Sequence, residues 1–298
     1  MKEAHLLFCI AGHGMEVIMP DTVDWKQVMP AFTPFRCDSS AEKETICSMR
    51  IIDNPIDIES GSIEVLKEES GLYGYWFCLM ESEQNYIVDI QFVENWKCYR
   101  MITDKSFSTA TAYVDYNDKY VDMVLSLFLM IVFGQAAVQH QTFLIHASAV
   151  EKDQQGYLFL GKSGTGKSTH SQLWICNIEG TRLLNDDNPA IRIEKDGSVY
   201  VYGTPWSGKT PCYQNRKASL KALIRLEQAS ANRLTWKKGV NALITLLPGC
   251  LSMRWNELLY KEMCDLLEKV IDKVKVGYLE CLPDKEAALL CYKEINEL

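Results

Sequence analysis

Residues 157–168, Tyr-Leu-Phe-Leu-Gly-Lys-Ser-Gly-Thr-Gly-Lys-Ser, decide the fold of the second half of the chain. Within this stretch, residues 161–168 match the pattern G-x-x-x-x-G-K-[ST] in full. The apolar run 157–160 predicts a short buried strand, and we expect a helix to start at Lys167. A strand, a glycine-rich turn and a helix in this order are typical of a phosphate-binding P-loop, or Walker A motif.

Each part of this pattern has its own physical role. Glycines let the backbone approach phosphate without a steric clash, and exposed amides at a helix N-terminus direct positive dipole ends at an anion. We expect Lys167 to reach the β- and γ-phosphates of ATP, and Ser168 to offer its hydroxyl to Mg²⁺. The residues expected to contact the nucleotide are Gly161, Lys162, Ser163, Gly164, Thr165, Gly166, Lys167, Ser168 and Thr169. The alternative is a strand–helix turn that holds no ligand.

Two aspartates follow the loop at a distance that suits a metal site. Asp186 and Asp187 come directly after the apolar segment 182–184, which predicts a buried strand. A carboxylate at a strand end beside a phosphate-binding loop is where magnesium is usually held. One aspartate would hold the metal, and the other would take the proton of an attacking hydroxyl. The alternative is a polar turn before Pro189.

His146 lies in the apolar segment 143–150, which reads as one strand. A single histidine inside such a strand is more often a hydrogen-bonded core residue than a functional one. Taken alone, the pattern therefore favours a structural role for His146.

The chain of 298 residues is long enough for two domains, and its charge differs between the halves. Residues 1–118 contain 9 Lys and Arg against 20 Asp and Glu, a net charge of −11, whereas residues 119–298 have a net charge of +3. Segments between residues 62 and 114 are rich in β-forming residues with turn-like clusters between them. We therefore expect a smaller, mainly antiparallel β domain of unknown role at 1–118, and an α/β domain at 119–298.

Composition excludes several classes of protein. The acidic residues 1–118 lack the clustered positive charge that nucleic-acid backbones require, and the near-neutral residues 119–298 can still hold a nucleotide at one local site. The 11 cysteines show no C-x-x-C spacing and fit reduced thiols in the cytoplasm. The apolar stretch 124–138 is interrupted by polar residues and is shorter than a bilayer requires, so we expect a buried helix. We therefore expect a cytoplasmic protein without nucleic-acid or membrane partners.

The second half alternates strands and helices. Expected strands lie at 182–184, 222–226 and 274–279, and expected helices at 236–247, 253–270 and 284–296. A hairpin is expected at 190–202, because Asp196-Gly197 between two β-rich segments suits a type I′ turn.

The helix near 120–140, His146, the loop 161–168 and the pair Asp186-Asp187 together resemble the C-terminal domain of HPr kinase/phosphorylase and its relatives. These proteins share the phosphoenolpyruvate carboxykinase-like P-loop fold. The resemblance covers about residues 120–298. It implies phosphoryl transfer, with Lys167 and Ser168 binding phosphate and magnesium, Asp186 or Asp187 serving as metal ligand and base, and His146 near the γ-phosphate.

A second segment also resembles HPr-kinase-like proteins. Residues 202–209, Tyr-Gly-Thr-Pro-Trp-Ser-Gly-Lys, recur in uncharacterised members. Lys209 would then neutralise the transferring group, a role that such reactions require, or it is a surface lysine after a glycine turn. Trp206 is interpreted as a core residue.

Three functions remain open. The first is a kinase that transfers the γ-phosphate of Mg-ATP to the hydroxyl of an unidentified small molecule, peptide or protein. The second is a nucleotide-binding switch or scaffold with little or no hydrolysis. The third is a carboxykinase-type metabolic enzyme. The resemblance also makes a homo-oligomer plausible, and the choice between ATP and GTP has no local signature in the sequence.

Overall fold

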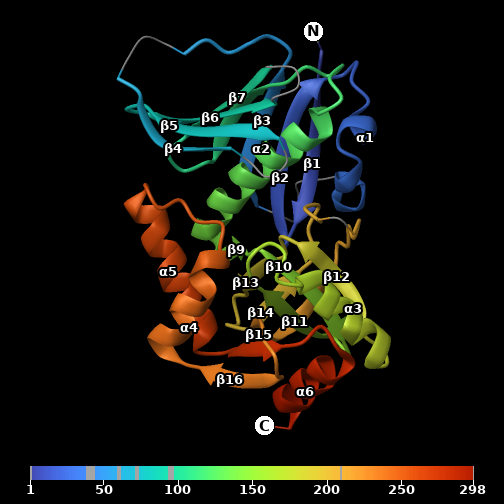
Figure 1. The fold of residues 1–298 in the computed structure, drawn as a ribbon. Helices are drawn as coiled ribbons and strands as arrows, with labels where there is room; N and C mark the ends of the chain where they lie inside the picture. The colour runs from blue at the N-terminus through green and yellow to red at the C-terminus, as the bar shows by residue number, and fades with distance from the viewer. Residues whose placement is uncertain are drawn as a thin grey trace. The chain divides into compact units, whose positions relative to one another are not determined.

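The computed structural model describes residues 2–37, 44–58, 62–70, 74–92, 97–208 and 210–297. These residues form a mixed α/β structure with two sheets, in which strands predominate (Figure 1). The chain divides into two compact units. One consists of Met1–His140 with Met253–Leu259, and the other of Gln141–Ser252 with Tyr260–Leu298.

The first unit is built on an eight-stranded sheet with the order β1-β2-β3-β8-β7-β6-β5-β4. Its neighbours are antiparallel except at β3, which runs parallel to both β2 and β8. The short helices α1 (Trp25–Val28) and η1 (Pro30–Phe35) precede β3. The strands are β1 (Glu3–Ile10), β2 (His13–Pro20), β3 (Thr45–Ile52), β4 (Glu64–Ser70), β5 (Tyr75–Glu81), β6 (Asn85–Phe92), β7 (Cys98–Asp104) and β8 (Thr109–Tyr113).

The long apolar helix belongs to this first unit. Helix α2 (Val121–Ala136), extended by η2 (Ala137–His140), packs against β3, β7 and β8. Its mean hydropathy of 2.1 and its length match a membrane span, but 61% of it is buried inside the protein, as expected for a core helix. Because α2 covers this sheet, the division between the units falls after residue 140, whereas the sequence predicted a boundary at 118/119.

The second unit contains the other sheet, with the order β12-β10-β11-β15-β14-β13-β9. Off this path, β17 pairs with β15, and β16 pairs with β17. Strand β15 runs parallel to β11 and β17, and the remaining pairs are antiparallel. The strands are β9 (Thr142–Leu144), β10 (Ala147–Lys152), β11 (Gln155–Leu160), β12 (Arg182–Asp187), β13 (Ala190–Ile193), β14 (Val199–Tyr202), β15 (Lys217–Gln228), β16 (Arg233–Lys237) and β17 (Lys275–Cys281).

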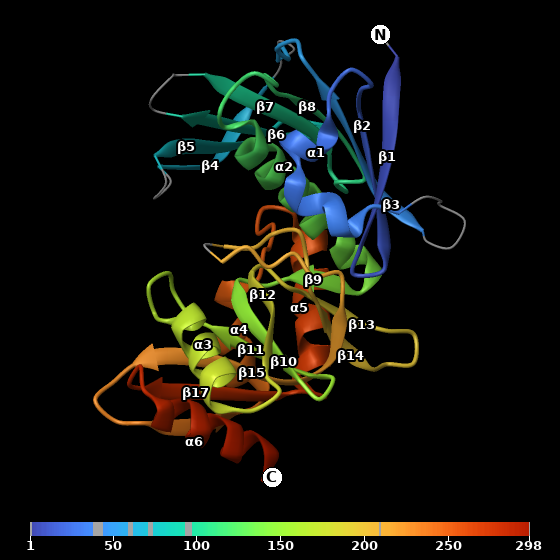
Figure 2. The same cartoon turned by 90° about the vertical axis from the view of Figure 1, so that its right-hand side faces the viewer.

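Helices cover this second sheet. Helices α3 (Lys167–Asn177) and α6 (Lys285–Asn296) pack together on one face, where Trp174 and Cys291 are fully buried among residues of β11 and β15 (Figure 1). Figure 2 gives the perpendicular view, with α3 and α6 on the same side of the sheet. The other helices of the C-terminal part are α4 (Gly239–Leu246), η3 (Leu247–Gly249) and α5 (Glu257–Ile271).

Pairing with β10 aligns the ends of its two neighbours, β11 and β12. Ala147, the first residue of β10, lies opposite Leu160, the last residue of β11, and also opposite Asp187, the last residue of β12. Since both pairings are antiparallel, the carboxyl ends of β11 and β12 and the amino end of β10 meet at one edge of the sheet. The residues that follow β11 and β12 and the residues that precede β10 therefore lie close together at this edge.

Three local predictions differ from the structure. The predicted strand 143–150 is broken between β9 and β10, because the amides of Ile145 and His146 bond to Pro189 and Gly249 instead of continuing the ladder. Residues 236 and 237, expected to start a helix, end β16, which pairs with β17.

The third difference concerns a turn. The hairpin of β13 and β14 forms, but its loop spans residues 194–198, and Gly197 has a φ of 82° while Asp196 is not among the residues with positive φ. A type I′ turn requires positive φ at both central residues. The two-residue loop Asp153-Gln154, with φ of 50° and 63°, meets this requirement between β10 and β11.

Gly203, which follows β14, is a position where only glycine fits. A Cβ atom added here would lie 2.0 Å from the carbonyl oxygen of Gln214 and 3.0 Å from that of Leu184. Both neighbours are backbone atoms, which cannot rotate away. We expect Gly203→Ala to lower the free energy of unfolding by about 2–3 kcal/mol, measured by urea denaturation.

Gly249→Ala is the matched control for Gly203→Ala. Its added Cβ would meet the side chain of Leu160 at 3.3 Å, and a side chain can shift. The free energy of unfolding of Gly249→Ala should fall by less than about 1 kcal/mol. Equal losses in the two variants would contradict the steric explanation.

Candidate functional site

The glycine-rich loop 161–166 connects β11 to α3 in the second unit. Gly164 and Gly166 have φ of 82° and 106°, a region that side-chain-bearing residues rarely adopt. The backbone amide and the hydroxyl of Thr165 both donate to the carbonyl oxygen of Lys162, at 3.1 and 2.8 Å, and close a turn. Gly166 then caps α3, so the helix N-terminus with its unpaired amides faces the loop.

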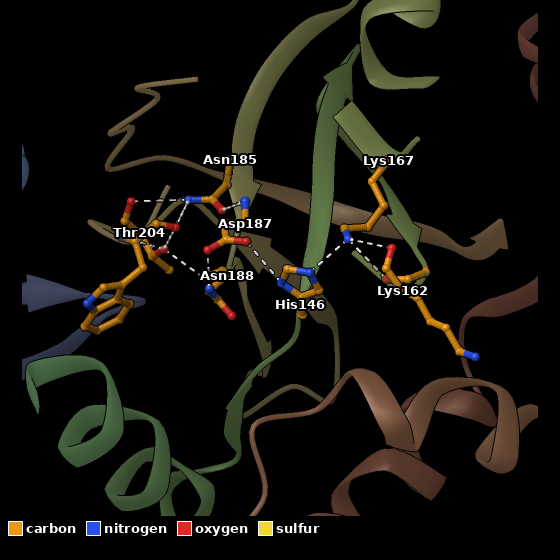
Figure 3. A network of polar contacts seen from close by, with 9 residues as sticks. His146, Lys162, Lys167, Asn185, Asp187, Asn188 and Thr204 are labelled. Carbon is orange, nitrogen blue, oxygen red and sulfur yellow. Dashed lines mark hydrogen bonds and ion pairs between the residues drawn. The ribbon is translucent and has the colours of Figure 1, made fainter. Parts of the chain in front are cut away.

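Three polar side chains form a continuous chain beside this loop (Figure 3). Asp187 at the end of β12 lies 3.1 Å from Nδ1 of His146, measured from its Oδ1. Nε2 of His146 lies 2.8 Å from Nζ of Lys167 on the first turn of α3. The same Nζ donates to the carbonyl oxygens of Gly161 at 3.1 Å and Lys162 at 3.5 Å. The sheet edge therefore brings together three residues that are far apart in the sequence.

The hydrogen-bonding pattern defines the roles of these groups. An ammonium group only donates, so Nε2 of His146 accepts from Lys167. The ring then carries its hydrogen on Nδ1 and donates it to the Asp187 carboxylate. Burial lowers the pKa of Lys167, while the charges of Asp187 and Asp186 act in the opposite direction. His146 is half-exposed, which excludes the core role that its apolar sequence context favours.

A second network fixes the position of Asp187. Asn185 is fully buried, and its amide nitrogen donates to the carbonyl oxygen and hydroxyl of Thr204, at 3.3 and 3.1 Å, and to the carbonyl oxygen of Trp206 at 3.2 Å. Its Oδ1 accepts from the backbone amide of Asp187 at 3.1 Å. Asn188 donates to the Oδ2 of Asp187 at 2.8 Å. The carboxylate is thus held from both sides.

Asp186 differs from Asp187 in its surroundings. It is 6% exposed, and its Oδ1 is buried without a hydrogen-bond partner among the described residues. A buried carboxylate oxygen without a donor destabilises a fold unless a cation satisfies it. Carboxylate oxygens are preferred ligands of Mg²⁺, so Asp186 fits a magnesium site. No cluster of three or more His, Cys, Asp or Glu side chains with metal-binding geometry occurs among the described residues.

The remaining predicted site residues lie as follows. Lys162, Ser163, Ser168 and Thr169 are exposed on the loop and on the first turn of α3, where a ligand has access to them. Lys209 lies outside the described residues, so its predicted role is not addressed by the structure. Trp206 is 3% exposed, as expected for a core residue.

The sequence reasoning did not identify Asn185, Thr204 and Asn188 as parts of the site. Asn185 and Asn188 flank the aspartate pair, and Asn-Asp-Asp-Asn after a buried strand was the available signal. Thr204 lies in the segment 202–209, but nothing in the sequence links it to its partners Asn185 and Asn188, which lie in a different part of the chain.

His170 on α3 is buried directly behind the loop, with 3% of its surface exposed. Its Nε2 accepts from Nε1 of Trp174 at 3.1 Å, and its ring packs edge-on against Phe159. Burial lowers the pKa of His170 from 6.5 to about 4. The ring is therefore neutral at physiological pH.

This burial predicts a pH dependence of stability. Between pH 6.5 and about 4 the unfolded chain binds a proton at His170 that the folded chain does not. The free energy of unfolding therefore falls as the pH decreases through this window, and the contribution of this residue amounts to roughly 3 kcal/mol. His170→Gln keeps an acceptor for Trp174 and does not titrate, so we expect it to show a shallower fall in urea unfolding between pH 7.5 and 4.5. Parallel curves for the two proteins would contradict a neutral, buried His170.

Comparisons with known proteins assign this chain to no family. A scan against protein-family models found no match, and a search of curated proteins found no significant match. Among solved structures, the chain is similar to the Hpr(Ser) kinase/phosphatase from Coxiella burnetii, with 12% sequence identity and a TM-score of 0.31. The similarity covers 52% of this chain and 88% of the other. It indicates a distant structural relation and establishes no activity.

Proposed function

We propose that the second unit binds Mg-ATP at a P-loop formed by residues 161–168 and transfers the γ-phosphoryl group to a hydroxyl acceptor. The observation that supports this most strongly is the chain of contacts from Asp187 through His146 to Lys167 beside the glycine-rich loop. Through His146, the sheet edge links Lys167, a cation that can bind phosphate, to Asp187, a carboxylate that can take the proton of the acceptor.

The loop and α3 bind the phosphates. Positive φ at Gly164 and Gly166 lets the loop backbone curve, and the N-terminus of α3 follows directly. Free amides at this terminus attract anions. The hydrogen bonds of Lys167 go to the His146 ring and to carbonyl oxygens, so a phosphate oxygen that replaced a carbonyl oxygen as its partner would gain a charge-assisted hydrogen bond.

Asp186 and Ser168 would hold the metal. Asp186 supplies a buried carboxylate oxygen that lacks a donor, and Ser168 supplies an exposed hydroxyl on the first turn of α3. Magnesium bound there would offset the negative charge of the phosphates.

Asp187 is the base in this proposal. The acceptor oxygen forms a bond to the γ-phosphorus, the bond from that phosphorus to the β–γ bridging oxygen breaks, and its electron pair leaves with ADP. The acceptor proton passes to the Asp187 carboxylate, which Asn188 and His146 orient. His146 also fixes the position of Lys167, so the base and the phosphate-binding cation keep a constant separation.

Lys167→Ala tests the binding step. We expect it to weaken Mg-ATP binding by a factor of about 100 or more, because it removes the only cation in the contact chain described above. Lys195→Ala, which removes an exposed lysine from the β13–β14 loop, is the charge-matched control and should bind like the wild type. Calorimetric titration measures both. Unchanged affinity in a folded Lys167→Ala protein would sink the proposal.

Isosteric changes of the two aspartates separate their roles. Asp186→Asn replaces a buried carboxylate, one oxygen of which lacks a donor, so it should raise the free energy of unfolding by roughly 1 kcal/mol while abolishing the gain in ATP affinity from Mg²⁺. Asp187→Asn keeps an acceptor for His146, so it should retain binding and lower turnover by about 100-fold or more.

The two Asn variants also address the alternative of a nucleotide-binding switch. The measurements are titration with ATP with and without Mg²⁺, and γ-phosphate release in the presence of cell extract. Identical behaviour of the two variants would contradict the division of roles. Tight binding with no transfer in any extract would favour the switch over the kinase.

A further inference from the structure

A cavity lies in the second unit on the far side of the glycine-rich loop from Asp187. It has a volume of about 410 Å³ and is lined by the loop at Gly164–Gly166, by one face of α3, and by the ends of β15 and β17. None of the residues in the Asp187–His146–Lys167 chain lines it. Its volume falls in the usual range of sites that hold small molecules.

Strand direction explains why the cavity borders the loop. Strand β11 runs parallel to β15, and β15 runs parallel to β17, so the carboxyl ends of all three strands point the same way. Gln228 lies opposite Cys281 in the register of β15 and β17, and both residues line the cavity. The strand order β12-β10-β11-β15 places the aspartates on one side of the loop and this cavity on the other.

We propose that this cavity binds the base of the nucleotide, and that it selects adenine over guanine. The inference rests on the proposed function, because it assumes that the phosphates lie on the glycine-rich loop. A nucleotide with its phosphates on the loop at Gly164–Gly166 extends its base into the cavity that these same residues border.

The walls of the cavity suit a flat aromatic ring. Leu173 of α3 and Leu226 of β15 line it, together with Leu282 and Pro283, which follow the end of β17. Such apolar surfaces bury the faces of a base without requiring hydrogen bonds. Proline lacks an amide hydrogen, so Pro283 adds an apolar wall without an unpaired donor.

The polar groups of the cavity match adenine. His170 lines it and is buried, and because its Nε2 accepts from Trp174, its ring hydrogen is carried on Nδ1. A neutral imidazole with an N–H can donate to a ring nitrogen of a purine. Gln228 donates its Nε2 to the carbonyl oxygens of Gly164 at 3.3 Å and Thr165 at 3.4 Å, so Oε1 remains as an acceptor for an exocyclic amine.

The absence of carboxylates argues against guanine. Guanine presents an N1–H and an exocyclic amine on one edge, and a carboxylate is the best acceptor for this pair of donors. None of the described residues that line the cavity is Asp or Glu. Adenine presents one amine beside ring acceptors, which a neutral donor and one amide oxygen can satisfy.

Ligands that differ only in the base test the proposal in the wild-type protein. Calorimetric titrations with ATP, GTP and inorganic tripolyphosphate, each with Mg²⁺, compare the same phosphate chain with and without a base. We expect ATP to bind at least about tenfold more tightly than tripolyphosphate, and more tightly than GTP. Equal affinities of ATP and GTP would overturn the selection of adenine.

A variant that fills the cavity gives the second test. Ala229→Phe places a ring where the base would lie, so ATP affinity should fall at least about tenfold while tripolyphosphate affinity stays unchanged. Ser230→Phe is the matched control, because Ser230 is the exposed neighbour that does not line the cavity. Circular dichroism checks that both variants fold.

The outcomes separate this inference from the proposed function. If ATP and tripolyphosphate bind equally in the wild type, the loop binds phosphate and the base site is overturned. Equal loss of both ligands in Ala229→Phe, with Ser230→Phe unaffected, would also overturn it, since the substitution would then act on the loop. If neither ligand binds the wild type, the proposed function fails together with the base site.

Discussion

The pairing of β10 with both β11 and β12 is the constraint on which the candidate site depends. Ala147 lies opposite Leu160 on one side and Asp187 on the other. A shift of either pairing by one residue would turn the side chains of the shifted strand to the opposite face and move its end along the edge. The contact of 3.1 Å between His146 and Asp187 depends on the observed register of β10 and β12. Consecutive residues of β10 and β11 are buried on both faces of the sheet, so a shifted register would exchange the side chains that pack on the two faces.

The break before β10 supplies the histidine. Within an uninterrupted strand, His146 would pair with a neighbouring strand through its backbone. Instead the Ile145 amide donates to Pro189 and the His146 amide donates to Gly249 at 2.7 Å, so the chain leaves one ladder and enters another. His146 therefore lies at the edge with a half-exposed side chain. Its ring reaches Asp187 and Lys167 together because β10 starts at the next residue.

Local sequence patterns were sufficient to predict the helix and the strands around the glycine-rich loop. The start of α3 at Lys167, the strand before the loop and the buried strand that ends at the aspartates follow from glycine placement and apolar periodicity, and the structure contains each of them. The break at His146 was not predictable in this way, since it depends on partners more than 40 residues away along the chain. An apolar segment looks the same whether it forms one strand or two.

The same reasoning explains other differences. Trp236 and Lys237 fit a helical pattern, but pairing with β17 places them in a strand, and long-range pairing overrides local preference. The Asn185 network was missed because Thr204 and Trp206 reach it from another part of the chain. The α2 helix was recognised, but its assignment to the first unit depends on the strands that it covers.

Two charged residues of the site, Lys167 and Asp186, lie in surroundings that are unfavourable for the folded protein without a ligand. Lys167 has its pKa lowered by burial, and its hydrogen bonds go to the His146 ring and to carbonyl oxygens. These partners satisfy its donors without neutralising its charge. Asp186 is an acceptor rather than a donor, and its buried Oδ1 lacks a donor. A ligand that brings phosphate oxygens to the lysine and a cation to the carboxylate would relieve both costs at once. In the proposed function, two unfavourable groups of opposite charge, held at one sheet edge without direct pairing, would favour binding more than a lysine and an aspartate paired with each other.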